Sequence, residues 1–189
     1  LVYHLPVEKA VHDAWSRGRL PVWSEDLSGG RPLLPNPSTG SLYPVRPLLS
    51  RLPFPAAMRV FPVAQWFLGG LGMLLALRIL GASPAGAWVG AATFVFSGVL
   101  ISQVFYVPSL PAATLLPWVL WAAARPARRA AARAVPIGCV FGLLFLLGEA
   151  FVVAIAALVA LLWIGLGVAR AERGREIAWW AAGLALAGL

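Results

Sequence analysis

Charged residues are scarce in this chain of 189 residues. Lys, Arg, Asp and Glu together make up 12% of it, about half of their usual share in soluble domains. Hydrophobic residues make up 60%, and the mean hydropathy is +0.82, whereas soluble domains average roughly 45–50% apolar residues. This composition excludes an ordinary soluble domain and predicts an integral membrane protein.

Cysteine and histidine are also rare. Cys139 is the only cysteine and lies in an apolar run, so an intrachain disulfide is excluded. The two histidines and this cysteine do not have the spacing of a metal site. We therefore predict no cofactor, while a divalent metal bound by carboxylate oxygens stays open. The net charge of +8 comes from basic residues scattered between apolar runs, which favours membrane topology over a nucleic-acid partner.

The apolar runs follow a polar head, which we define as residues 1–57. Residues 58–189 form the predicted transmembrane domain, with candidate spans at 60–80, 85–103, 107–124, 134–147, 150–168 and 177–189. A single helix over 134–168 would be about 50 Å long, too long for a bilayer core of about 30 Å, so we expect a break near Gly148–Glu149. The chain starts at Leu1 and ends inside an apolar run, and we expect it to be truncated at both ends.

Basic residues alternate between the predicted loops. Arg78 follows the first span, and further arginines fill 125–133 and 170–175, whereas 104–106 and Gly148–Glu149 carry none. Because cytoplasmic loops are enriched in Lys and Arg, the alternation places the head outside the cytoplasm.

The head combines a helix with a stiff loop. Pro6 and Gly18 suit the start and end of a helix, and an apolar stripe that ends at Trp15 predicts a short helix lying flat at the membrane interface, Trp15 toward lipid. Lys9–Asp13 and Asp13–Arg17 have the spacing of helical ion pairs. Residues 18–57 hold eight prolines, which exclude a long helix or an inner strand.

The loop carries turn signals throughout. Gly29 and Gly30 predict a tight turn with positive φ. The prolines that follow this turn stiffen the chain. We expect purely structural roles for Trp23, Gly29, Gly30, Pro32 and Pro44.

The loop GRLPVWSEDLSGGRPLLPNPSTGSLYPVRPLL resembles the first external loop of YfhO-like bacterial membrane proteins. The residues that match the pattern are Gly18, Pro21, Trp23, Gly29, Gly30, Pro32, Asn36, Pro37, Gly40, Tyr43 and Pro44. The resemblance continues through LGGLGMLLALRILGAS, TFVFSGVLISQ and LPWVLWA. It implies an all-α, polytopic, GT-C-like fold in the bacterial inner membrane.

The resemblance also implies an activity. GT-C glycosyltransferases take a sugar from a polyprenyl-phosphate carrier on the external face, so the implied partners are membrane lipids, this donor and a cell-envelope polymer or lipid acceptor. The family's main acid would fall before Leu1. The family has Asn-Pro where this chain has Ser24-Glu25, so no role is carried onto Glu25 or Asp26.

Candidate site residues each have a structural alternative. Glu25 and Asp26 could share a metal or a proton, or belong to a solvated turn. His4 lies nearest the expected position of the missing acid, or is a structural histidine. Candidates for substrate binding are Arg46, Arg51, Arg59, Asn36, Tyr43, Gln103 and Glu149. The arginines would hold a carrier phosphate or anchor lipid headgroups, and Glu149 is an acid between two spans.

We expect a groove between residues 18–46 and the outer ends of spans 60–80 and 85–103. Arg59 should share it with His4, Glu25, Asp26 or Asn36. A non-catalytic scaffold and a lipid or sugar transporter remain alternative functions; no predicted span carries the central charge that many ion-coupled pathways use.

Overall fold

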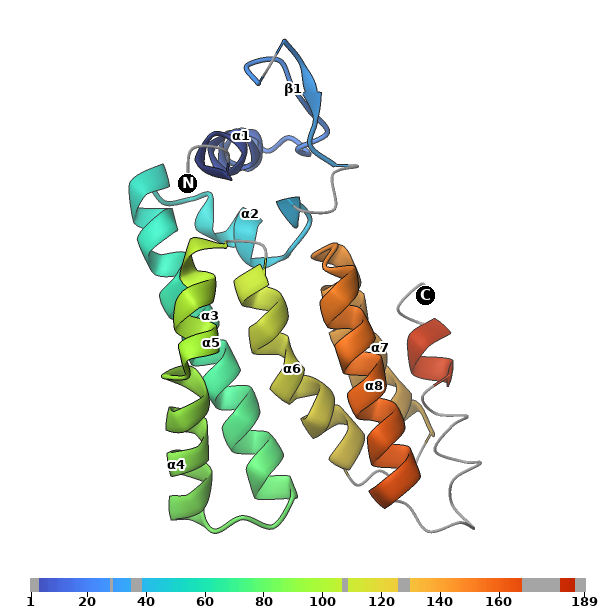
Figure 1. Cartoon of the computed structure of the whole chain (residues 1–189). Helices are drawn as coiled ribbons and strands as arrows, with labels where there is room; N and C mark the ends of the chain where they lie inside the picture. Colours follow the sequence, from blue (N-terminus) through green and yellow to red (C-terminus); the bar gives the residue numbers. More distant parts are fainter. Residues whose placement is uncertain are drawn as a thin grey trace.

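The computed structural model describes residues 4–27, 29–34, 39–106, 109–125, 130–167 and 181–185. A small head sits on one end of a bundle of apolar helices (Figure 1). The head comprises α1 (His4–Ser16), the two-residue strands β1 (Trp23–Ser24) and β2 (Arg31–Pro32), and α2 (Val45–Leu49). The bundle comprises α3 (Phe54–Ile79), α4 (Pro84–Val95), α5 (Gly98–Ser102), the 3₁₀ turn η2 (Gln103–Phe105), α6 (Ser109–Ala124), α7 (Ala130–Leu146) and α8 (Ala150–Gly167).

Two stretches could cross a membrane by length and composition. They are α3, with 26 residues, and Pro84–Ser102, with 19; both agree with the first two expected spans. The next three expected spans are also helical but shorter. Of the last, 177–189, residues 181–185 are described and are helical, and the rest lies outside the described residues.

Two breaks interrupt the long apolar segments. The expected break near Gly148–Glu149 is confirmed: Gly148 has a φ of 70°, and α8 begins only at Ala150. That backbone region favours glycine, so the local sequence encodes the turn. The second break was not expected. Ser97 accepts a hydrogen bond from the backbone N–H of Leu100 and so starts α5 as a separate short helix.

Helices α3 and α6 pack closely against each other at Gly72. A Cβ built on Gly72 would come within 2.5 Å of the Trp118 indole nitrogen, which donates a hydrogen bond to the carbonyl oxygen of Leu68 at 3.0 Å. Small residues let two membrane helices approach in this way. The hydrophobic core comes largely from α6, α7 and α8, and includes Leu115, Val119, Ile137, Phe141 and Leu144.

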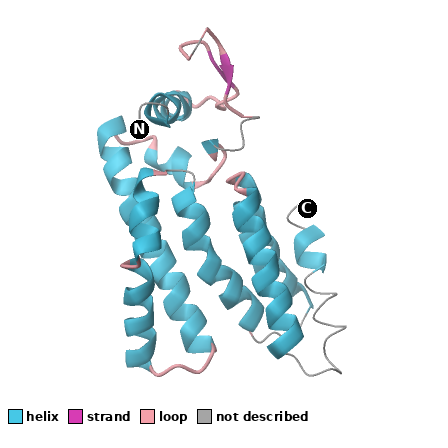
Figure 2. Cartoon of the chain, in the orientation of Figure 1, coloured by secondary structure: helices cyan, strands magenta, loops and turns pink. Residues whose placement is uncertain are grey.

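The connections alternate between the two ends of the bundle (Figure 2). The turn between α3 and α4, beside Arg78, and the end of α6, beside Arg125, lie opposite the head (Figure 1). The α7–α8 turn lies at the head end. This arrangement agrees with the alternation of basic loops in the sequence.

Helix α1 packs differently from the expectation. Its apolar stripe faces the protein: Val7 and Val11 are buried in a cluster with Leu33, and the Trp15 indole N–H donates to the carbonyl oxygen of Ser41 at 2.9 Å. The expected contact of this stripe with lipid is therefore wrong. A loop that folds back over the helix covers the same apolar side chains that periodicity would assign to a membrane surface.

Candidate functional site at the head end

The glycine-rich turn forms a small hairpin. Trp23 pairs with Pro32, and Ser24 with Arg31. Gly30 has a φ of 114°, and a Cβ there would come within 2.9 Å of the Trp23 ring. The expected positive φ at Gly29 and Gly30 is confirmed. Since only glycine meets both requirements at position 30, this part of the motif shapes the head.

Glu25 and Asp26 lie in the turn that this hairpin closes. Both are exposed, and the hairpin projects away from the bundle (Figure 1). Their position matches the solvated turn that the sequence left as an alternative. It does not bring them to the ends of the spans.

The second part of the motif fastens the loop to the bundle. Gly40 has a φ of 50°, and a Cβ there would lie 3.2 Å from Leu147 at the α7–α8 turn. Tyr43 is buried, and its hydroxyl donates to Oε1 of Gln65 at 3.2 Å. Thr114 Oγ1 lies 3.2 Å from the same oxygen. This network joins the head to α3 and α6.

Burial also affects the chemistry of Tyr43. Loss of hydration raises the pKa of its phenol, and the Gln65 hydrogen bond and the Arg46 charge oppose this rise. Tyr43 is therefore a neutral hydrogen-bond donor inside the protein. Gln65 and Thr114 were missed by the sequence analysis, although a polar side chain within an apolar run was the available signal.

Arg46 is held inside the head. Its guanidinium makes a two-pronged ion pair with Glu8, with Nη2 at 3.1 Å from Oε1 and Nη1 against Oε2. The two side chains are 7% and 3% exposed, and the guanidinium carbon lies 5.6 Å from the centre of the Phe61 ring. The structure thus gives Arg46 an internal partner, Glu8, whereas the sequence analysis placed Arg46 against a carrier phosphate or lipid headgroups.

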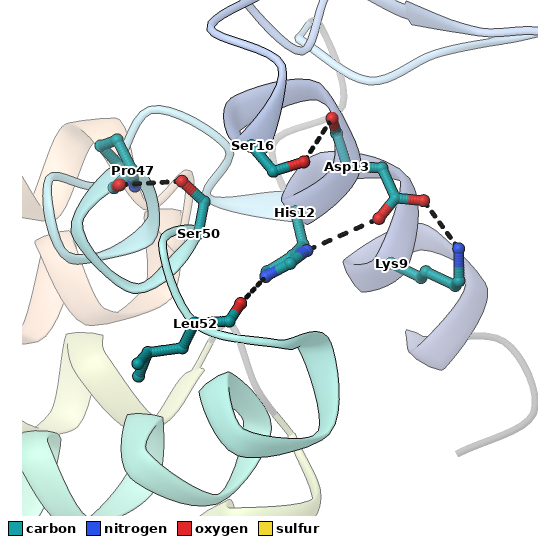
Figure 3. A network of polar contacts seen from close by, with 7 residues as sticks. All are labelled: Lys9, His12, Asp13, Ser16, Pro47, Ser50 and Leu52. Carbon is teal, nitrogen blue, oxygen red and sulfur yellow. Dashed lines mark hydrogen bonds and ion pairs between the residues drawn. The ribbon is translucent and has the colours of Figure 1, made fainter.

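His12 connects α1 to the start of α3 (Figure 3). Its Nε2 donates to the carbonyl oxygen of Leu52 at 3.0 Å, and its Nδ1 lies 3.5 Å from Asp13. Asp13 also accepts a hydrogen bond from Lys9 at 2.7 Å, which confirms the first of the two expected pairs. The Lys9 hydrogen bond is the main cause that lowers the pKa of Asp13; partial burial opposes it, and His12 adds to it.

A small cavity lies beneath these contacts. It measures about 20 Å³, which suits a single water molecule and is too small for a sugar. Its lining consists of Glu8, Val11, His12, Arg46, Leu49, Ala57, Met58 and Phe61. The expected partners Arg59, His4, Glu25 and Asp26 do not line it.

Glu149 is the one acid among the described residues of the bundle. It follows the Gly148 turn, and the Ser109 hydroxyl at the start of α6 donates to its Oε1 at 3.0 Å. Both side chains are half-buried. The pair therefore puts a carboxylate and a hydroxyl beside each other at the head end of the bundle.

The other candidates are dispersed. Arg51 lies in the turn before α3 and Arg59 in its second turn, and both are exposed. Gln103 is half-buried in η2. His4 begins α1, and Asn36 lies outside the described residues. Pro44 precedes the first residue of α2.

Comparisons with protein families, with curated proteins and with solved structures found no match to this chain. Within the part of the chain that the structure describes, no three His, Cys, Asp or Glu residues are grouped to hold a metal ion. Function must therefore be argued from the residues themselves.

Proposed function

We propose that this chain is part of a GT-C-like membrane glycosyltransferase related to the YfhO-like family, working on the external face of a bacterial inner membrane. The donor would be a polyprenyl-phosphate sugar and the acceptor a cell-envelope polymer or lipid. One observation carries the proposal: the motif residues hold a rigid head over the end of the bundle where Glu149 lies.

The proposed orientation follows from charge. Arg78 and Arg125 lie at the bundle end opposite the head, and basic residues favour the cytoplasmic side. All bundle helices then belong to a polytopic membrane domain, with α6, α7 and α8 completing the spans that α3 and Pro84–Ser102 begin. The head would be external.

The orientation can be tested by cysteine labelling in a Cys139→Ala background. An impermeant maleimide added from outside should modify Glu25→Cys at the hairpin tip. It should not modify Ala82→Cys, between α3 and α4, until the membrane is permeabilised. The reverse pattern would overturn the proposed topology.

Two chemical roles are proposed at the head end of the bundle. A carboxylate would act on the acceptor hydroxyl, and an arginine would bind the carrier phosphate. The Glu149 carboxylate would order or deprotonate an acceptor hydroxyl, with Ser109 fixing its orientation. Arg51 is exposed where the head meets α3, and it would attract the carrier phosphate. Exposed Glu25 and Asp26 take no part in this proposal.

Transfer of a labelled sugar from a polyprenyl-phosphate donor, measured in vesicles with the full protein to which this chain belongs, tests this assignment. Glu149→Gln should lower the rate roughly a hundredfold or more, the range of a lost general base. Glu25→Gln is the matched control and should leave the rate unchanged. Equal rates for Glu149→Gln and the unaltered chain would contradict the role of Glu149.

A non-catalytic scaffold is the second candidate. The observation that favours it is that the motif residues Gly30, Gly40 and Tyr43 pack against Trp23, Leu147 and Gln65 and so shape and fasten the head. A full protein that transfers no sugar although its head is external would support the scaffold over the transferase.

A further inference from the structure

An apolar groove runs along the outside of α3 and α4. Its volume is about 440 Å³, within the range of about 300–1,000 Å³ that ligand pockets occupy. Its walls are formed by Val63, Trp66, Phe67, Gly70, Leu71, Leu74, Trp88, Ala91, Ala92, Val95 and Phe96. Phe67, Trp88 and Phe96 are 74%, 69% and 75% exposed, so the groove is open along its side.

The helices that form the groove indicate that it lies at the depth of the membrane core. Its lining residues come from α3 and from Pro84–Ser102, the two stretches that are long and apolar enough to cross a bilayer. Every lining side chain is apolar apart from the indole nitrogens of its tryptophans. A hydrocarbon chain therefore suits it better than a polar ligand.

A cation stands at the head end of this groove. Arg59 precedes Val63 by four residues and Trp66 by seven, which puts it on the groove face of α3, about 6 Å above Val63 along the axis. Arg59 is exposed. From residue 27 to residue 148 the sequence holds no Asp or Glu, so no neighbouring acid in this stretch competes for it.

We propose that this groove binds a bilayer phospholipid with an anionic headgroup. One acyl chain would lie between α3 and α4, and the phosphate would contact the Arg59 guanidinium. Charge complementarity selects the occupant, because the groove is apolar and a cation, Arg59, lies at its head end. The proposal rests on the groove and on Arg59, and it holds whether or not the protein transfers sugars.

Lipid binding can be measured by native mass spectrometry of the purified chain titrated with phosphatidylglycerol or phosphatidylcholine. The unaltered chain should retain phosphatidylglycerol in preference to phosphatidylcholine. Arg59→Gln should lower its affinity roughly fivefold, because one Arg near a membrane surface contributes about 1 kcal/mol, and should leave phosphatidylcholine unaffected.

Two further variants, with one control, distinguish lipid binding in the groove from non-specific attraction of the headgroup to positive charge. Arg51→Gln removes an exposed arginine from the same end of the bundle and should not change the preference. Ala92→Phe places a ring in the groove and should lower binding of both lipids. Ala154→Phe, an exposed position on α8, is the matched control for added bulk, and thermal unfolding of each variant confirms that it folds.

Several results would overturn the proposal. Arg59→Gln and Arg51→Gln could weaken binding equally, which would mean non-specific attraction. Ala92→Phe could leave binding unchanged, which would exclude the groove. Polyprenyl phosphate could displace phosphatidylglycerol at stoichiometric amounts, which would make the groove a carrier site, and a dimer that Ala92→Phe dissociates would make it a protein interface.

Discussion

The head and the bundle are built from different kinds of interaction. In the head, turns are fixed by individual residues such as Gly30 and Gly40, and long-range contact depends on polar pairs such as Glu8–Arg46. In the bundle, helices follow from apolar runs, and their association depends on close approach at residues such as Gly72. One substitution in the head should therefore remove a specific contact, whereas one in the bundle should disturb packing over several side chains.

The difference arises from what each region can bury. The head buries few of its large apolar side chains, with Val7, Val11 and Leu33 as its own small cluster, so buried polar pairs decide how it docks. The bundle has apolar side chains on nearly every face, so hydrophobicity alone would not distinguish one helix pairing from another in the proposed membrane setting. Small residues and a few hydrogen bonds then determine which faces meet.

Removing the carboxylate of Glu8 should have the largest effect. Glu8→Ala leaves the buried Arg46 guanidinium without its partner, a loss of about 3–5 kcal/mol for buried pairs. Because the pair joins α1 to α2, the head should become sensitive to limited proteolysis while the bundle stays protected. Glu8→Ala combined with Arg46→Met should recover much of the loss; equal sensitivity of the single and double variants would mean that the pair does not hold the head.

Overpacking the bundle should come next. Gly72→Leu would drive its side chain into the Trp118 indole, where a Cβ alone already approaches within 2.5 Å. We expect a loss of about 1–3 kcal/mol, measured as a shift of global unfolding in detergent, with the head and bundle affected together. Gly98→Ala is the control, since its Cβ would meet nothing within 4 Å; a similar loss in both variants would contradict the close approach of α3 and α6.

A smaller effect is expected at the hairpin turn. Gly30→Val forces a branched side chain into a backbone conformation with positive φ and against Trp23. This strain should destabilise the hairpin by about 1–2 kcal/mol. Hydrogen exchange should rise in residues 22–34 and stay unchanged in α3. Faster exchange throughout α3 would mean that the hairpin and bundle are one cooperative unit, which would contradict the contrast drawn between them.

The smallest effect is expected from lowering the pH, which protonates Asp13. The folded-state pKa of Asp13 is lowered from 3.8, mainly by Lys9, so its contribution is present above that value and is lost as pH falls through the folded pKa. Proteolytic sensitivity of α1 should rise slightly below about pH 4. Lys9→Gln should flatten this dependence. An unchanged pH profile in that variant would exclude the Lys9–Asp13 pair as its source.

Several elements were predictable because they depend on local chemistry. Apolar runs predicted the positions of α3, α6, α7 and α8, and Gly148 predicted the break between the last two. Gly29 and Gly30 predicted a tight turn with positive φ, although not the hairpin that it belongs to. The candidate site was harder to predict from the sequence. Glu149 was identified as an acid between helices, but its partner Ser109, 40 residues away, was not.

The sequence by itself determined which long apolar segments are helical, that the backbone bends at Gly29, Gly30 and Gly148, and that basic residues alternate between the connections, because each depends on hydropathy, φ or charge within a few residues. Only the tertiary structure decided that Arg46 faces Glu8, that Tyr43 reaches Gln65, and that Val7 and Val11 of α1 lie against Leu33. Such partners lie far apart in the chain: Glu8 and Arg46 are separated by 38 positions. Their pairing depends on which faces pack together, and helical periodicity leaves that choice open.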